Sequence, residues 1–100
     1  MNFEIAPKET EIQANWDDAK LYCLSLNVDG KTEWRLPTKE ELNQIYESEN
    51  DFENEWYWSS TEAIGESGRG DYVWGQRMSG GNHGCGNKNF GYYVRAIRTI

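Results

Sequence analysis

The sequence predicts an α+β domain in which a short strand comes first, two helices follow and several strands complete the chain. Two stretches of the first half repeat apolar residues at helical spacing, whereas the second half has aromatic-rich runs separated by glycine-rich segments. Helices grouped before strands are typical of α+β domains and not of the alternation that builds a parallel sheet. With 100 residues, residues 1–100 are expected to form a single domain.

The chain is expected to begin with a strand and continue into a helix. Residues 2–7, Asn-Phe-Glu-Ile-Ala-Pro, alternate apolar and polar side chains and end at a proline, which predicts a short strand. Asn15 is the expected N-cap of the first helix, because its side chain can accept a hydrogen bond from an amide of the first turn. Gly30 is expected to end this helix in a left-handed conformation. The apolar stripe of this helix is Trp16, Ala19, Tyr22, Cys23 and Leu26.

The segment Trp-Arg-Leu-Pro-Thr-Lys-Glu-Glu-Leu, residues 34–42, carries the strongest helix-start signal in the chain. Thr38 and Glu41 have the spacing of a capping box, in which each side chain accepts from the other's backbone amide. Pro37 opposes an earlier start, because the residue before a proline avoids the helical region. The second helix is expected to bury Leu42, Ile45 and Tyr46.

Two residues just before that helix are expected to have structural roles. Trp34 is interpreted as a core anchor, since aromatic side chains supply much of the apolar area in a small domain. Arg35 is expected to form an ion pair with one of the many carboxylates.

The second half is expected to form three strands joined by loops. Residues 56–61, 71–78 and 92–100 are rich in aromatic and β-branched side chains, which favour strands. Residues 62–70 are expected to be a flexible loop. Residues 79–91 contain five glycines and three asparagines, and this composition predicts an irregular loop.

The charge of the chain excludes several classes of partner. There are 17 acidic and 10 basic residues, which give a net charge of −7. Such a chain repels phosphate backbones and anionic lipid surfaces, so no nucleic-acid partner is expected. No apolar run approaches the roughly 20 residues of a membrane-spanning helix, so no membrane insertion is expected either. The first residues lack the pattern of a signal peptide. The sequence leaves the localisation open. If the chain is a fragment of a larger protein, a bacterial surface or a phage particle is expected, and otherwise the cytoplasm.

Motifs for catalysis, cofactors or metals are missing from the sequence. His83 is the one histidine, and together with Cys85 it offers only two ligands where a zinc site needs three or four. No phosphate loop or dinucleotide fingerprint occurs. No catalytic residue, cofactor or metal is therefore expected. Cys23 and Cys85 could form one disulfide or stay reduced; we expect Cys23 buried on the first helix and Cys85 exposed in the loop.

The region 71–92 is the candidate ligand-binding surface. It mixes Tyr, Trp, Asn, Gly and Arg, as adaptable recognition surfaces do. A loop as long as the one expected at residues 79–91 usually has a function in a small domain. The alternative is a surface loop with a few aromatic side chains packed beneath it. The candidate residues are Tyr72, Trp74, Arg77, Asn82, His83, Asn87, Asn89 and Tyr92.

Four segments together carry a family resemblance. They are WDDAKLYCLSL, WRLPTKEEL, YWSST and YYVRAIR, in this order and at compatible spacing. In this combination the chain resembles the Lcl C-terminal-domain family, a domain of unknown function, from about Trp16 to Arg98. That family is similar to the formylglycine-generating-enzyme branch of the C-type-lectin-like fold.

The resemblance implies an architecture and a mode of action. The architecture is two helices flanking a twisted antiparallel sheet with long loops, and the first and last strands pair and bring the termini together. Ligand display from the loop-bearing half is implied. The oxidase relatives use a close cysteine pair, which the distant Cys23 and Cys85 do not match. Family members often have a cysteine where this chain has Ala96, so Cys23 lacks that partner and is expected to be reduced.

The expected function is therefore a non-catalytic ligand-binding module of the adhesin, surface-receptor or phage receptor-binding type. Its ligand would be a protein or a glycan. The alternatives are a structural or oligomerisation domain, in which the same aromatics meet a neighbouring subunit of a homo-oligomer, and a degenerate oxidase of the formylglycine-generating type.

Overall fold

The structure is a computed structural model that describes residues 2–49, 51–63 and 71–100. The predicted α+β class is confirmed, and most of the expected loop at 62–70 lies outside the described residues. No helix in the described part is long and apolar enough to cross a membrane. In chain order the elements are β1 (Phe3–Ile5), the 3-10 helix η1 (Lys8–Thr10), β2 (Ile12–Ala14), α1 (Trp16–Ser25), α2 (Lys39–Ser48), β3 (Trp56–Glu62), β4 (Tyr72–Arg77), β5 (His83–Asn87), β6 (Tyr92–Val94) and β7 (Ile97–Thr99).

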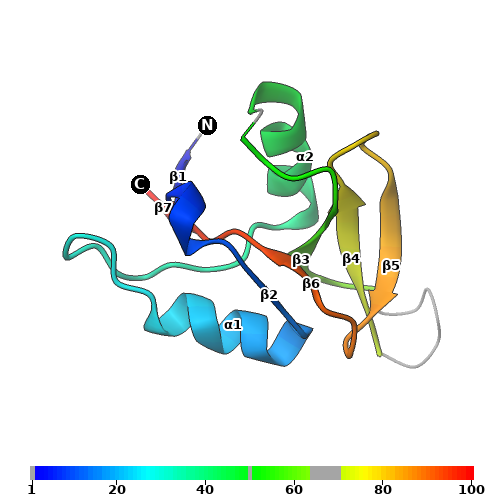
Figure 1. The fold of residues 1–100 in the computed structure, drawn as a ribbon, viewed down its shortest axis with the longest axis horizontal. Coiled ribbons are helices and arrows are strands. Elements are labelled where there is room, and N and C mark those ends of the chain that lie inside the picture. Colours follow the sequence, from blue (N-terminus) through cyan, green and yellow to red (C-terminus); the bar gives the residue numbers. More distant parts are fainter. Residues whose placement is uncertain (1, 50, 64–70) are drawn as a thin grey trace.

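The strands form two sheets instead of the single antiparallel sheet that was expected. The larger sheet has five strands in the order β2-β6-β3-β4-β5, and it is mixed because β3 and β6 run parallel where Tyr57 meets Tyr93. The smaller sheet pairs β1 with β7 antiparallel. The expected pairing of the first and last strands is thus confirmed. The amide of Ile100 donates to the carbonyl of Asn2 at 3.2 Å, and the two ends lie side by side (Figure 1).

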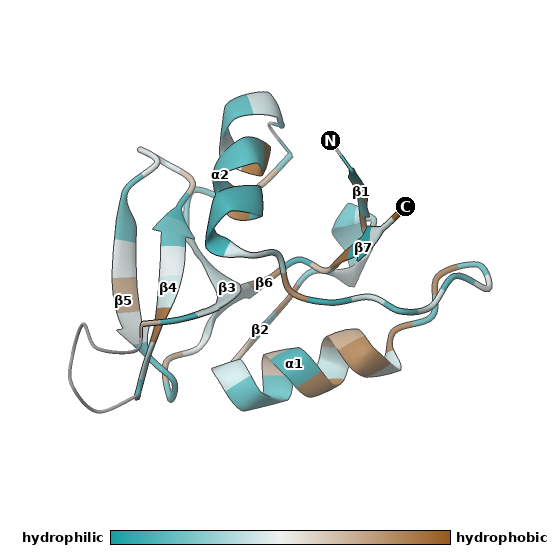
Figure 2. Ribbon diagram, turned by 180° about the vertical axis from the view of Figure 1, so that it is seen from behind, coloured by the Kyte–Doolittle hydropathy of each residue, from teal (hydrophilic) through white to brown (hydrophobic). Residues whose placement is uncertain are grey.

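The two helices cover opposite faces of the five-stranded sheet (Figure 1). On the α1 face, Trp58, Val73 and Val94 of the sheet share a buried cluster with Trp16 and Cys23 of α1. On the α2 face, α2 contacts β3 and β4. Hydrophobic residues colour the second half of α1, whereas α2 is mostly hydrophilic (Figure 2). The larger apolar cluster thus lies on the α1 face, whereas Ile45 of α2 belongs to a smaller cluster with Phe3 and Ile97.

Both helix starts are confirmed, but α1 ends earlier than expected. The Asn15 side chain accepts from the Asp18 amide at 2.9 Å. Thr38 Oγ1 accepts from the Glu41 amide at 3.1 Å and Glu41 Oε1 accepts from the Thr38 amide at 2.8 Å, which is the predicted capping box. Helix α1 ends at Ser25, so Gly30 does not cap it. Gly30 does have a positive φ of 86°, but in a tight turn several residues beyond the helix.

The segment before α2 has the structural roles that were expected of it. Trp34 is only 2% exposed. The Arg35 guanidinium donates to both Glu41 carboxylate oxygens, at 2.8 and 2.9 Å, so the carboxylate that caps α2 is also the predicted ion-pair partner. The Arg35 backbone exchanges hydrogen bonds with Ile97 at 2.7 and 2.8 Å. This segment thus fastens the start of α2 to the last strand.

The prediction of an irregular loop at residues 79–91 is wrong in its centre, where β5 is a regular strand paired with β4. The glycines that argued against a strand lie beneath aromatic rings, which leave no room for a Cβ atom. A Cβ on Gly84 would lie 2.9 Å from Cη2 of Trp56, and a Cβ on Gly86 would lie 2.6 Å from Cε2 of Tyr92. The composition reflects this close packing and not an absence of regular structure.

The C-terminal segment, predicted as one strand, is two strands in different sheets. Strand β6 pairs with β2, and β7 pairs with β1. Arg95 lies at the crossing between them and is 4% exposed. Its guanidinium donates to the Ala6 carbonyl at 2.7 Å, to Glu11 at 3.3 Å and to the Asp51 carboxylate at 2.9 Å. The chain changes sheets at the point where this side chain binds three separate segments.

Candidate functional site

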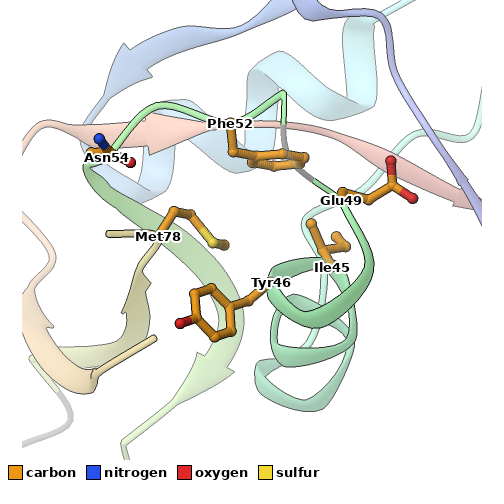
Figure 3. Close-up of a pocket in the computed structure, with 6 residues that line it drawn as sticks. All are labelled: Ile45, Tyr46, Glu49, Phe52, Asn54 and Met78. Carbon is orange, nitrogen blue, oxygen red and sulfur yellow. The ribbon is translucent and has the colours of Figure 1, made fainter. Parts of the chain in front are cut away.

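Two hollows lie along α2 where it faces the β4–β5 hairpin. The larger, of about 320 Å³, is lined by Lys39, Glu40, Asn43 and Gln44 of α2 and by His83 of β5. The smaller, of about 190 Å³, lies at the other end of α2 (Figure 3). Its lining residues are Ile45, Tyr46, Glu49, Phe52, Asn54 and Met78. We call the two hollows and the contacts between them the α2–hairpin surface.

One stripe of α2 makes the contacts that fix this surface. Lys39, Asn43 and Tyr46 are spaced three and four residues apart, so they lie on one side of the helix. The Lys39 ammonium lies 3.6 Å from the centroid of the Trp74 ring. The side chain of Tyr46 covers Gly81, where a Cβ would lie 2.6 Å from its ring. Helix and hairpin are therefore held together at both ends of the stripe.

In the middle of the stripe, Asn43 contacts the buried side-chain amide of Gln76. Gln76 is 0% exposed, and its Nε2 donates to Asn43 Oδ1 at 3.0 Å and to the Gly81 carbonyl at 3.1 Å. Its Oε1 is buried with no hydrogen-bond partner among the described residues. An unsatisfied buried acceptor costs about 1–3 kcal/mol. The buried Gln76 amide thus links α2 to the hairpin turn through its Nε2 and carries one unsatisfied acceptor.

Four of the predicted residues lie on the α2 face of the sheet. Strand register pairs Tyr72 with Asn87 and Gln76 with His83, and alternation along β4 puts Trp74 on the same face as Tyr72. Of these four, His83 is the one that lines either of the two hollows described above. The Trp74 ring has one face occupied by Lys39, so this aromatic group belongs to the contact between helix and hairpin.

The other four predicted residues lie elsewhere. Arg77 pairs with Trp56 and thus points to the α1 face. Tyr92 also lies on that face, with its ring centroid 4.3 Å from that of Trp58. Asn82 is exposed in the hairpin turn. The fourth, Asn89, is exposed in the turn after β5, and its amide donates to the Asn87 side chain at 2.9 Å. The predicted set is therefore divided between two faces and two turns.

Sequence reasoning missed the helical half of this surface. Lys39, Glu40, Asn43 and Gln44 were left out because a polar stripe on a helix is usually its solvent-facing side. Met78 lies just after β4, and its thioether has no polar signature to mark it. The expectation that Tyr46 is buried is wrong, because its side chain is 37% exposed at this surface.

The two cysteines differ in exposure, and burial affects the pKa of the Cys23 thiol. Neither cysteine is in a disulfide; Cys23 is buried and Cys85 exposed, as expected. Burial raises the pKa of the Cys23 thiol to about 12, so little thiolate forms at neutral pH. In the part of the chain that the structure describes, no group of three His, Cys, Asp or Glu side chains could hold a metal ion.

Comparison with known proteins identifies the family of the chain. A search of the curated proteins found no match. The family model of the Lcl C-terminal domain matches residues 4–98, which covers both helices and all the strands but the first residue of β1 and the last of β7. The chain therefore belongs to the Lcl C-terminal domain family.

Proposed function

We propose that this domain is a non-catalytic ligand-binding module whose α2–hairpin surface contacts a protein or a glycan. The observation that carries the proposal is the pair of hollows beside α2, with exposed polar side chains between well-anchored elements. Glu40, Gln44 and His83 make no side-chain hydrogen bond or ion pair with any described residue. Their polar groups are thus available to a ligand without loss of an internal contact.

The architecture supports display. We infer a C-type-lectin-like arrangement, in which paired termini lie on one side of the molecule and the ligand surface on another. The termini meet at the β1–β7 sheet, whereas the hairpin lies at the far side of the domain (Figure 1). Arg35 and Glu41 fasten the start of α2, which makes one wall of the surface rigid. A preformed wall lowers the entropic cost of binding.

The absence of catalysis is part of the proposal. An oxidase of the formylglycine-generating type would use two cysteines close together, but here one is buried on α1 and the other exposed on β5. The high pKa of the Cys23 thiol also makes it a poor nucleophile at neutral pH.

Glycan and protein arrays would test the proposal. The wild-type domain is compared with a double variant, Gln44→Ala and His83→Ala, which truncates both walls of the larger hollow. Gln13→Ala, an exposed residue on the opposite edge strand, is the control. We expect the double variant to keep its melting temperature and to lose affinity about fivefold or more, since truncation of important contact residues costs more than about 1 kcal/mol. A folded double variant with wild-type affinity for every array ligand would contradict the proposal.

A second candidate function, association of copies, is favoured by α1. Leu21 and Leu24 are 63% and 72% exposed and lie one turn apart on that helix. Beside them is a largely apolar hollow of about 240 Å³, with Trp34 and Leu36 in its lining. Mass measured over a range of concentrations tests this role. A dimer that dissociates in Leu24→Gln, but not in the Gln44 and His83 variant, would support it; a monomer at all concentrations would contradict it.

A further inference from the structure

The smaller hollow of the α2–hairpin surface has an apolar floor and a polar rim (Figure 3). Ile45 and Tyr46 come from α2, Phe52 from the segment after it and Met78 from the hairpin. Figure 3 shows the thioether of Met78 directed between the rings of Phe52 and Tyr46, with Glu49 at the edge. Neither Glu49 nor Asn54, the two polar lining residues, uses its side chain in a hydrogen bond to any described residue.

The rim is negatively charged. The segment from Glu47 to Glu55 contains five acidic residues. Two of them are neutralised, because Asp51 binds Arg95 at 2.9 Å and Glu53 binds Lys8 at 2.8 Å. The remaining acids are Glu47, Glu49 and Glu55, and no cation of the described residues lies within ion-pair distance of them. Glu49 is the acid of this group that lines the hollow.

The size of the hollow limits what it can receive. Its volume is about 190 Å³, and a cavity of roughly 150 Å³ holds one benzene molecule. The hollow therefore accommodates a single side chain and not a helix or strand. An apolar floor with a carboxylate at the edge matches a long side chain that has an apolar stem and a cationic end.

We propose that this hollow receives a lysine or arginine side chain of a protein ligand. The stem lies against Phe52 and Met78, and the cationic end reaches the Glu49 carboxylate and the Asn54 side-chain carbonyl oxygen at the rim. The exposed Tyr46 ring adds a cation–π contact. The net charge of −7 attracts a basic partner over longer distances. This inference rests on the proposed function and specifies the ligand as a protein with an exposed basic residue.

Short capped peptides provide the test. Four tripeptides, with Lys, Arg, norleucine or Glu between two glycines, are titrated into the domain, and amide chemical shifts are followed by NMR. Norleucine has an apolar stem similar to that of lysine but no charge. We expect the Lys or the Arg peptide to bind about two- to fivefold more tightly than the norleucine peptide, the range for a partly exposed ion pair. The Glu peptide should bind most weakly. The largest shifts should lie at Tyr46, Glu49, Asn54 and Met78.

Two variants decide which carboxylate is responsible. Glu49→Gln should reduce the preference for the basic peptide over norleucine to about one. Glu9→Gln removes an exposed carboxylate that lines neither hollow and should leave the preference unchanged. The inference is overturned if norleucine binds as tightly as both basic peptides, if the preference survives Glu49→Gln, or if the shifts map elsewhere. Loss of array binding in the Gln44 and His83 variant would still support the proposed function in that case.

Discussion

Replacement of Gly86 by alanine tests the explanation given for the glycine-rich strand β5. A Cβ at this position would lie 2.6, 2.7 and 2.8 Å from Cε2, the hydroxyl oxygen and Cζ of Tyr92. Such distances require that the ring or the strand move. The Tyr92 ring has little room, because ring centroids of Trp58, Trp56 and Phe90 lie 4.3, 5.8 and 5.8 Å away. The added methyl group therefore forces several aromatic side chains apart.

The magnitude follows from this confinement. Overpacking of a well-packed interior typically costs 1–3 kcal/mol, and three neighbouring rings make relaxation difficult, so we expect a loss of about 2 kcal/mol in the free energy of unfolding. For a domain of this size that corresponds to a fall of roughly 10 °C in melting temperature. Alanine has a higher intrinsic strand preference than glycine, which would act in the opposite direction.

Urea denaturation of the wild type and four variants measures the effect: Gly86→Ala, Gly80→Ala, Tyr92→Ala and the Tyr92→Ala, Gly86→Ala double variant. Gly80→Ala is the matched control, since nothing lies within 4 Å of its added Cβ, and it should change stability by less than about 0.5 kcal/mol. In a Tyr92→Ala background the ring is gone, and Gly86→Ala should then cost little. If Gly86→Ala is as stable as the wild type, or if its cost persists without the Tyr92 ring, the steric explanation of β5 is refuted.

Three further predictions concern the start of α2 and the cysteines. Thr38→Ala should lower the free energy of unfolding by about 1 kcal/mol through loss of the capping box; an unchanged urea midpoint would contradict this. The Arg35 guanidinium, with Thr38, lowers the pKa of Glu41 below its ordinary 4.5. The ionised carboxylate therefore stabilises the fold above about pH 4.5, and this stability is lost as the pH falls through the lower pKa of the folded state. Urea titrations at a series of pH values should show this loss in the wild type but not in Glu41→Gln. A thiol reagent should label Cys85 in the native domain but Cys23 only after unfolding, and rapid labelling of both would show that α1 opens readily.

The elements that the sequence predicts correctly are those decided by neighbouring residues. Thr38 and Glu41 cap one another across a single turn, and Asn15 caps α1 in the same local way. An ion pair of Arg35 was predicted without a named partner, and the structure shows that the partner is Glu41. Such contacts depend on few dihedral angles, so the residue types and their spacing suffice to predict them.

The features that could not be predicted depend on residues far apart in the chain. The glycines of β5 are explained only by Trp56 and Tyr92, which no local pattern connects with them. Likewise, the C-terminal segment divides at Arg95 into β6 and β7 because these strands pair with partners in two different sheets. The candidate site combines α2 with a hairpin more than thirty residues away, and its helical half has the composition of a solvent-exposed stripe. Of the two hairpin residues that line the hollows, His83 was predicted from the sequence, whereas Met78 and the helical wall were not.

The β1–β7 sheet has a mechanical consequence. Its strands are antiparallel, with Phe3 opposite Thr99 and Ile5 opposite Ile97. A force that separates the two ends would open this pair like a zipper, one hydrogen-bonded pair at a time, which resists much less than sliding two strands past each other. Tension from both ends would therefore peel away β1 and β7 first, up to the anchor at Arg95. Helix α2 and the hairpin would still be folded at that point, so a bound ligand could remain attached while the ends of the domain extend under load.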